Sequence, residues 1–87
     1  MKILLVEWLD SVSLAGWHPA ADALDELTAD DALHHTTVGH LVADLPDLIV
    51  LAASRGLAPR SELGDVIGIP RPAILNVTDL TPKSAGK

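Results

Sequence analysis

Runs of apolar residues separated by short polar breaks divide the chain into five candidate strands and one candidate helix. Residues 18–27 (HPAADALDEL) predict a short helix, because Pro19 suits the first helical position and acidic residues fill the early turns. Leu24 and Leu27 share one face of that helix. The strands are expected where Val, Ile and Leu alternate with other residues or run together, at 2–9, 36–44, 48–54, 64–70 and 73–80.

Two local features predict sharp bends in this β structure. Gly39 interrupts the second strand, and a bulge there would turn Val38 inward and His40 outward. Pro70-Arg71-Pro72 separates the last two strands, because two prolines that lack backbone donors force a break or a corner. Five short strands, a glycine bend and a proline corner predict a mainly β fold, a small, strongly bent five-stranded barrel with one short helix after the first strand.

The predicted barrel forms a single domain over residues 1–80, followed by a disordered tail at 81–87. The strands at 2–9 and 48–54 are apolar on both faces, which is more apolar surface than one five-stranded barrel buries. Either the helix or a second subunit must cover the excess, and we expect both to do so. Whether the helix packs on its own barrel or on a neighbour's is left open by the sequence.

Composition strengthens the expectation of self-association. A chain of 87 residues has a marginal core, and the absence of cysteine excludes disulfide stabilisation. Phe and Tyr are also absent, so Val, Ile, Leu and Ala must build the core, with Trp8 and Trp17 as anchors. The chain is expected to be a homo-oligomer.

The charges are distributed unevenly. Between Ile3 and Ser54 there are nine acidic residues and no Lys or Arg, and the net charge of the chain is −6. This balance argues against nucleic-acid binding, which normally needs a broad positive surface. No secretory signal and no apolar stretch long enough for a membrane span are evident, which predicts a cytoplasmic protein without membrane contact.

Three of the four histidines stand in LHHTTVGHLV, residues 33–42, which raises the question of a metal site. A structural zinc site needs about four converging ligands. Here His34 and His40 share a strand face only without the bulge, and His35 lies opposite. The sequence favours exposed or core-edge histidines over a metal site, and no cofactor is expected.

A ligand site is the sharper alternative for the tryptophans and arginines. A groove lined by Trp8 and Trp17, with Asp10 and Ser11 at its edge, would receive a ligand, although both tryptophans serve equally well as core or interface anchors. The forked guanidinium group of arginine suits anions, and in an oligomer three arginines would converge on a single anion. The simpler interpretation is that the arginines are scattered over the surface. The candidate ligand residues are Trp8, Asp10, Ser11, Trp17, His40, Arg55, Arg60 and Arg71.

Catalytic motifs are not evident. The serines lie in no G-x-S-x-G elbow, there is no cysteine nucleophile, and the glycines at 39, 56, 64 and 68 form no phosphate-binding loop. The chain is expected to be non-enzymatic.

The segments VEWLDS, TVGHLV and DVIGIP-x-x-AI resemble a group of small bacteriophage proteins with an SH3-like or Sm-like barrel. The positions that carry the resemblance are Trp8, Asp10, Ser11, Val38, Gly39, Ile69, Pro70, Arg71 and Ile74. A cysteine often stands in that group where this chain has His35, so a role tied to that thiol does not transfer. The resemblance implies an accessory protein of phage type, and rings that close through the edges of the last two strands.

Three functions follow as expectations. The first is a homo-oligomer that sequesters a small anionic, nucleotide-like ligand in a counter-defence role. The second is a protein-binding module that inhibits a host protein through its acidic surface. The third is a single-stranded nucleic-acid-binding Sm-like ring, which the net charge disfavours.

Overall fold

The computed structural model describes residues 1–57, 59 and 61–83. It contains five strands, one α-helix and one short 3-10 helix. Their bounds are β1 (Ile3–Leu9), α1 (Ala20–Leu27), β2 (His34–Asp44), β3 (Leu48–Arg55), β4 (Leu63–Pro70), η1 (Arg71–Ala73) and β5 (Ile74–Asp79). The predicted strands, the helix and the break at the proline corner all lie within two residues of these bounds.

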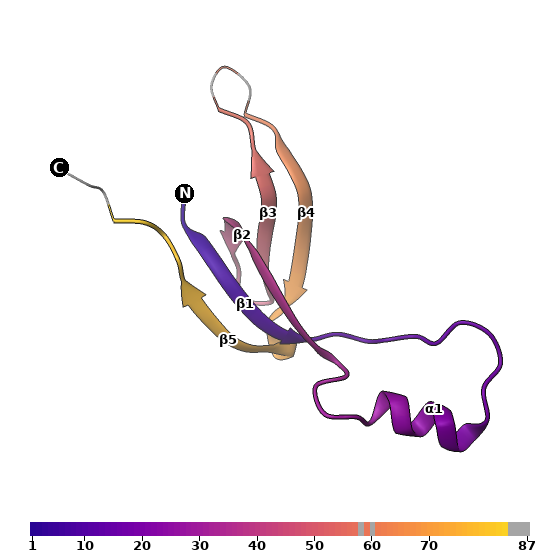
Figure 1. Ribbon diagram of the computed structural model, residues 1–87. Coiled ribbons are helices and arrows are strands. Elements are labelled where there is room, and N and C mark those ends of the chain that lie inside the picture. The colour runs from indigo at the N-terminus through magenta and orange to yellow at the C-terminus, as the bar shows by residue number, and fades with distance from the viewer. Residues whose placement is uncertain (58, 60, 84–87) are drawn as a thin grey trace.

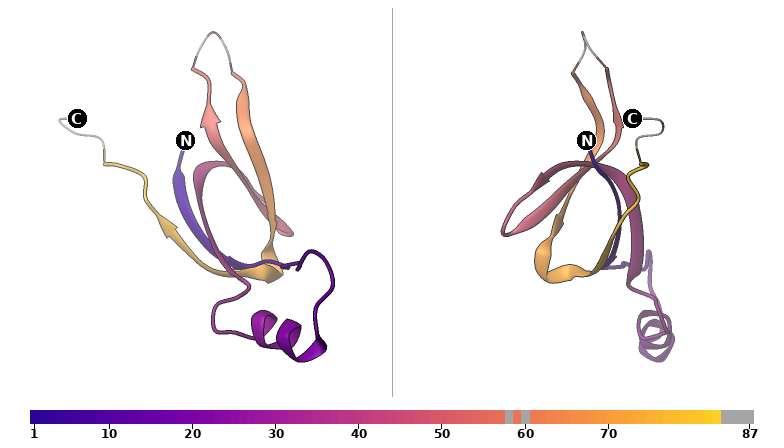
Figure 2. Two further views of the ribbon diagram at one scale, coloured as in Figure 1. Left: turned by 45° about the vertical axis from the view of Figure 1, so that its right-hand side comes forward. Right: turned by 90° about the vertical axis from the view of Figure 1, so that its left-hand side faces the viewer.

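The five strands form one antiparallel sheet in the order β4-β3-β2-β1-β5 (Figure 1). Within the described residues, β4 pairs only with β3 and β5 pairs only with β1, so the sheet is open at both edges. The mainly β class with five strands and one short helix is confirmed, but the closed barrel that the sequence predicted is not seen. The sheet is bent strongly enough to enclose a small core (Figure 2).

The core is small and entirely aliphatic, as the composition predicted. Its buried side chains are those of Leu4, Val6, Ile49, Leu51, Ala52 and Ile69. Trp8, Leu41, Ile67 and Ile74 pack against this cluster while remaining partly exposed. Six buried side chains give a chain of this length little hydrophobic stabilisation.

The bulge in β2 lies elsewhere than the sequence predicted. β1 and β2 pair without interruption through Gly39, and the register shifts instead between Leu41 and Ala43, where β2 pairs with β3. Val38 is consequently exposed and pairs with Leu5, contrary to the inward position expected for it. The glycine is required at position 39 for a different reason, because a Cβ there would lie 2.9 Å from the Ala52 carbonyl oxygen of β3.

The proline corner is closed by an arginine. Pro70, Arg71 and Pro72 lead from β4 through η1 into β5. The Arg71 guanidinium donates to the Asp44 carboxylate and, from Nε and Nη2, to the Leu45 carbonyl oxygen at 3.2 and 2.7 Å. The side chain therefore joins the corner to the β2–β3 turn.

The chain is elongated for its length. Its radius of gyration is 17.0 Å, whereas a compact domain of this size has about 12 Å. Two parts project from the sheet in opposite directions, the segment 10–33 that contains α1, and the distal part of the β3–β4 hairpin (Figure 1). We call them the arm (residues 10–33) and the hairpin tip (the described residues from 53 to 65).

Candidate functional site

The arm leaves β1 after Leu9, carries α1 and returns to β2 at His34, at a distance from the sheet in every view (Figures 1 and 2). No residue of α1 is buried. The Trp17 side chain is 102% exposed and Leu24 is 62% exposed. An indole held fully in water is unusual, because Trp ordinarily buries much of its large surface in a core or an interface. The arm is therefore the strongest candidate for a binding surface.

Helical spacing separates the arm into two chemically distinct sides. Residues three and four apart lie on one face of a helix, so Ala20, Ala23, Leu24 and Leu27 form an apolar stripe. The opposite side of α1 carries the acidic stripe, which consists of Asp22, Asp25 and Glu26. Such an amphipathic helix normally covers its apolar side, and here Leu24 on that side faces solvent.

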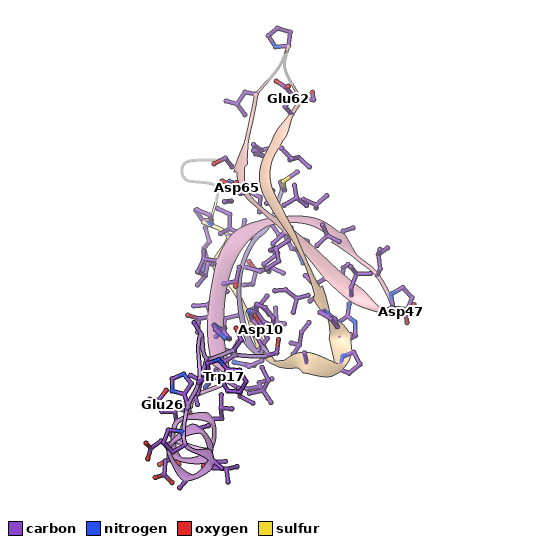
Figure 3. All side chains as sticks on the ribbon, turned by 90° about the vertical axis from the view of Figure 1, so that its right-hand side faces the viewer. Asp10, Trp17, Glu26, Asp47, Glu62 and Asp65 are labelled. Atoms are coloured by element: carbon purple, nitrogen blue, oxygen red, sulfur yellow. The ribbon has the colours of Figure 1, made fainter. Side chains whose placement is uncertain are left out.

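The arm is strongly anionic. It holds six carboxylates, and no Lys or Arg lies among its residues; the acids are Asp10, Asp22, Asp25, Glu26, Asp30 and Asp31. Figure 3 shows Glu26 and Trp17 together in this part of the molecule, far from Asp47 and Asp65. The arm thus combines an exposed indole with a concentrated negative potential.

The root of the arm is fixed to the sheet. The Asp10 N–H donates to the Leu33 carbonyl at 2.8 Å, which brings the two ends of the arm together. His34 then lies between two carboxylates, with Nδ1 3.4 Å from Asp31 Oδ1 and Nε2 3.9 Å from Glu7 Oε1. Asn76 of β5 donates to the second Glu7 oxygen at 3.0 Å. These contacts orient the arm relative to β1, β2 and β5.

Trp8 is a structural residue of the sheet. Its Nε1–H donates to Thr37 Oγ1 at 3.0 Å, and its ring lies 5.5 Å from that of His35, centroid to centroid. The sequence interpretation of Trp8 as an anchor agrees with this position. Trp17 contacts no core within a single chain, so for this residue the interface half of the interpretation stays a prediction.

The candidate ligand residues are not gathered into one site within a single chain. Asp10 and Ser11 lie together at the arm root, where Asp10 Oδ1 accepts the Ser11 N–H at 2.8 Å. His40 pairs with Ile3 and so lies at the other end of β1 from Trp8. Trp17 lies out on the arm.

The arginines are also separated. Arg55 pairs with Leu63 at the hairpin tip, and Pro70, next to Arg71, pairs with Leu48 at the opposite end of β3. The strand between these positions spans about 23 Å. Arg71 is already bound to Asp44, and Arg60 lies outside the described residues. An anion held by arginines from several copies stays a prediction.

The described part of the chain contains no pocket and no group of three or more His, Cys, Asp or Glu side chains arranged to hold a metal ion. The two ring nitrogens of His34 face different carboxylates, and His35 packs against Trp8. In the described ranges, no helix is long and apolar enough to cross a membrane.

Sequence reasoning overlooked the most distinctive feature, the detachment of the arm. The signal was present in the apolar spacing at 20, 23, 24 and 27, and in the long interval between the first two strands. Comparisons with protein-family models, with curated proteins and with solved structures found no match for this chain. Function must therefore be argued from the surface itself.

Proposed function

We propose that this protein is a non-catalytic binding protein that acts as a homo-oligomer and recognises another protein through its acidic arm. The single observation that carries the proposal is the acidic stripe of α1, which is exposed on an arm with six carboxylates and no Lys or Arg. Complementary charge accelerates and orients encounters between proteins.

The chemistry of the arm indicates the kind of partner. The acidic stripe of α1 suits a protein surface rich in Lys and Arg, and it repels nucleic acid and acidic membranes. Of the functions expected from the sequence, inhibition of a host protein through an acidic surface therefore has the most structural support. The assignment to a phage-type accessory protein located in the host cytoplasm is supported by the sequence resemblance alone.

We also propose that the bent sheet is of the SH3-like or Sm-like kind. Five antiparallel strands in the order β4-β3-β2-β1-β5, with a 3-10 corner between β4 and β5, support this assignment. The two open edges are consistent with the homo-oligomer that the resemblance implies, because unpaired strand edges readily pair with another chain.

The test of the proposed recognition uses a pair of variants matched in charge. Asp22→Asn/Glu26→Gln removes two charges from the acidic stripe, and Asp47→Asn/Asp79→Asn removes two charges from the turn after β2 and the end of β5, outside both the arm and the hairpin tip. Figure 3 shows Asp47 far from Glu26. Each immobilised protein is incubated with bacterial cell extract, and the bound proteins are identified and then purified for a binding assay. We expect one partner to be retained by the wild type and the Asp47/Asp79 variant, and to be lost from the Asp22/Glu26 variant and at high salt. Equal retention by all three baits would contradict the proposal.

A further inference from the structure

The chain exposes more surface than a folded monomer of its mass. Its accessible surface is 6473 Å² for 9.1 kDa, whereas a compact monomer of that mass exposes roughly 4,900 Å². The excess, on the order of 1,500 Å², falls in the range of roughly 1,000–2,500 Å² that each chain buries in an obligate oligomer. The shape of one copy therefore matches that of a subunit taken from an assembly.

The arm supplies one half of an apolar contact. Trp17 and Leu24 are its most exposed large apolar residues, and Val12 is exposed in the segment before them. Because α1 contributes no buried residue to its own chain, nothing in the described part of that chain covers Leu24. The arm requires an apolar surface from outside the chain.

The hairpin tip supplies a matching half. The pairing of β2 with β3 stops at Ala52, so β3 and β4 continue beyond it as a two-stranded ribbon. Arg55 and Leu63 are directly paired across this ribbon and so share a face. Leu63 is exposed there, and Leu57, just after β3, is 70% exposed. The described charged residues of the tip are Arg55, Glu62 and Asp65, so the tip matches the arm through its apolar residues and carries little net charge of its own.

Geometry and charge decide between the possible pairings. The arm and the hairpin tip lie at opposite ends of a molecule 58 Å long, so they do not meet within one copy (Figure 1). Two arms packed together would bring twelve carboxylates into one interface, which like-charge repulsion disfavours. An arm against a hairpin tip instead joins six carboxylates to a segment whose described charges are Arg55, Glu62 and Asp65, so the like-charge repulsion is much smaller.

We propose that the arm of one copy docks on the hairpin tip of a second copy, with Trp17 and Leu24 packed against Leu63 and Leu57. Two copies lying antiparallel satisfy both contacts at once, which closes the assembly as a symmetric dimer. The acidic stripe of α1 then remains on the outside. The inference rests on the homo-oligomer of the proposed function and is independent of recognition by the acidic stripe.

Sedimentation of arm variants tests whether the arm carries the self-association. The wild type is expected to sediment as a dimer of the 9.1 kDa chain, and Trp17→Ala/Leu24→Ala as a monomer with an unchanged far-ultraviolet spectrum. Val38→Ala is the matched control, because Val38 is similarly exposed but lies on β2, inside the sheet and away from both of its open edges. It should leave the dimer intact. A monomeric wild type, or an oligomer that survives the arm substitutions, would overturn the inference; the second outcome would leave the homo-oligomer of the proposed function standing.

Cross-linking identifies the partner surface. The chain has no cysteine, so introduced cysteines form unambiguous disulfides. When Leu24→Cys and Leu63→Cys proteins are mixed, unfolded, refolded together and mildly oxidised, we expect the mixed disulfide-linked pair to predominate. A predominance of Leu24→Cys pairs would show arm-to-arm docking, and an absence of mixed pairs at any protein concentration would equally reject the hairpin tip.

Discussion

Gly39 of β2 packs directly against the backbone of Ala52 in β3. A Cβ at position 39 would lie 2.9 Å from the Ala52 carbonyl oxygen and 3.1 Å from Leu51 Cβ. The first distance is shorter than real Cβ contacts allow, and the atom it meets is backbone that belongs to a buried strand. Gly39→Ala is therefore expected to lower the free energy of unfolding by about 1–3 kcal/mol, as overpacking of a core commonly does.

Urea unfolding of Gly39→Ala against Gly64→Ala checks this expectation. A Cβ at position 64 would meet only Ser54 Cβ at 3.5 Å, which is an ordinary contact. Both substitutions reduce the backbone freedom of the unfolded chain equally, so the comparison isolates the packing of Gly39. If the two variants unfolded at the same urea concentration, the close approach of β2 to β3 would be refuted.

Arg71 joins two turns that are distant in sequence, and its geometry depends on the guanidinium fork. Arg71→Ala is expected to lower the free energy of unfolding by about 1 kcal/mol, because the contacts are partly exposed to solvent. Arg71→Lys should recover little of this loss, since an ammonium group does not reproduce simultaneous contacts with Asp44 and the Leu45 carbonyl. Chemical denaturation measures the free energy of unfolding of the three proteins. A lysine variant as stable as the wild type would show that the corner does not depend on the guanidinium group of Arg71.

Asp79 ties the end of β5 to the segment that follows it. The Thr81 hydroxyl and then its backbone N–H, 2.8 Å from Asp79 Oδ1, hold the pKa of the Asp79 carboxyl below its ordinary value of 3.8, with a smaller contribution from Lys2. A lowered pKa means that the folded state favours the carboxylate, so this contribution is present above the ordinary value and is lost as the pH falls through the folded pKa.

Carbon-detected NMR titration of the carboxyl groups measures this directly. The Asp79 carboxyl should titrate with a pKa below 3.8 in the wild type. This pKa should be higher in Thr81→Val, because valine lacks the hydroxyl that lowers it. A wild-type value at or above 3.8 would contradict the described contacts.

Zinc is expected to leave the melting temperature unchanged. The histidines at 34, 35 and 40 do not converge, whereas a bound metal would stabilise the fold increasingly as its concentration rises above the dissociation constant. Differential scanning fluorimetry over a zinc series provides the measurement. A concentration-dependent rise in melting temperature would show that a metal site forms after all, within one copy or between copies.

Local patterns were sufficient to predict the strands and the helix because each element here is bounded by its own stop signal. Pro70 and Pro72 end β4, and short continuous apolar runs mark β1 and β3. The prediction of a bulge at Gly39 was wrong because a glycine shows only that the backbone is free to bend at that position. Which residue is left unpaired depends on how β2 aligns with β3, and that alignment is a relationship between strands.

The candidate site was harder to predict for a related reason. Trp8 and Trp17 are the same residue type, yet one packs on the core and the other is fully exposed. The difference arises because Trp8 lies on the inner face of β1, opposite His35, whereas Trp17 belongs to an arm that the sheet does not cover. Burial of this kind depends on the position of a whole segment, which no short pattern encodes.

Native mass spectrometry of the purified wild-type protein tests the central claim most directly, that one copy is a subunit of a self-associated binding protein. The account predicts a species of twice the 9.1 kDa chain mass, with no small molecule needed for its formation. A spectrum that contains only the 9.1 kDa monomer at micromolar concentration would contradict it.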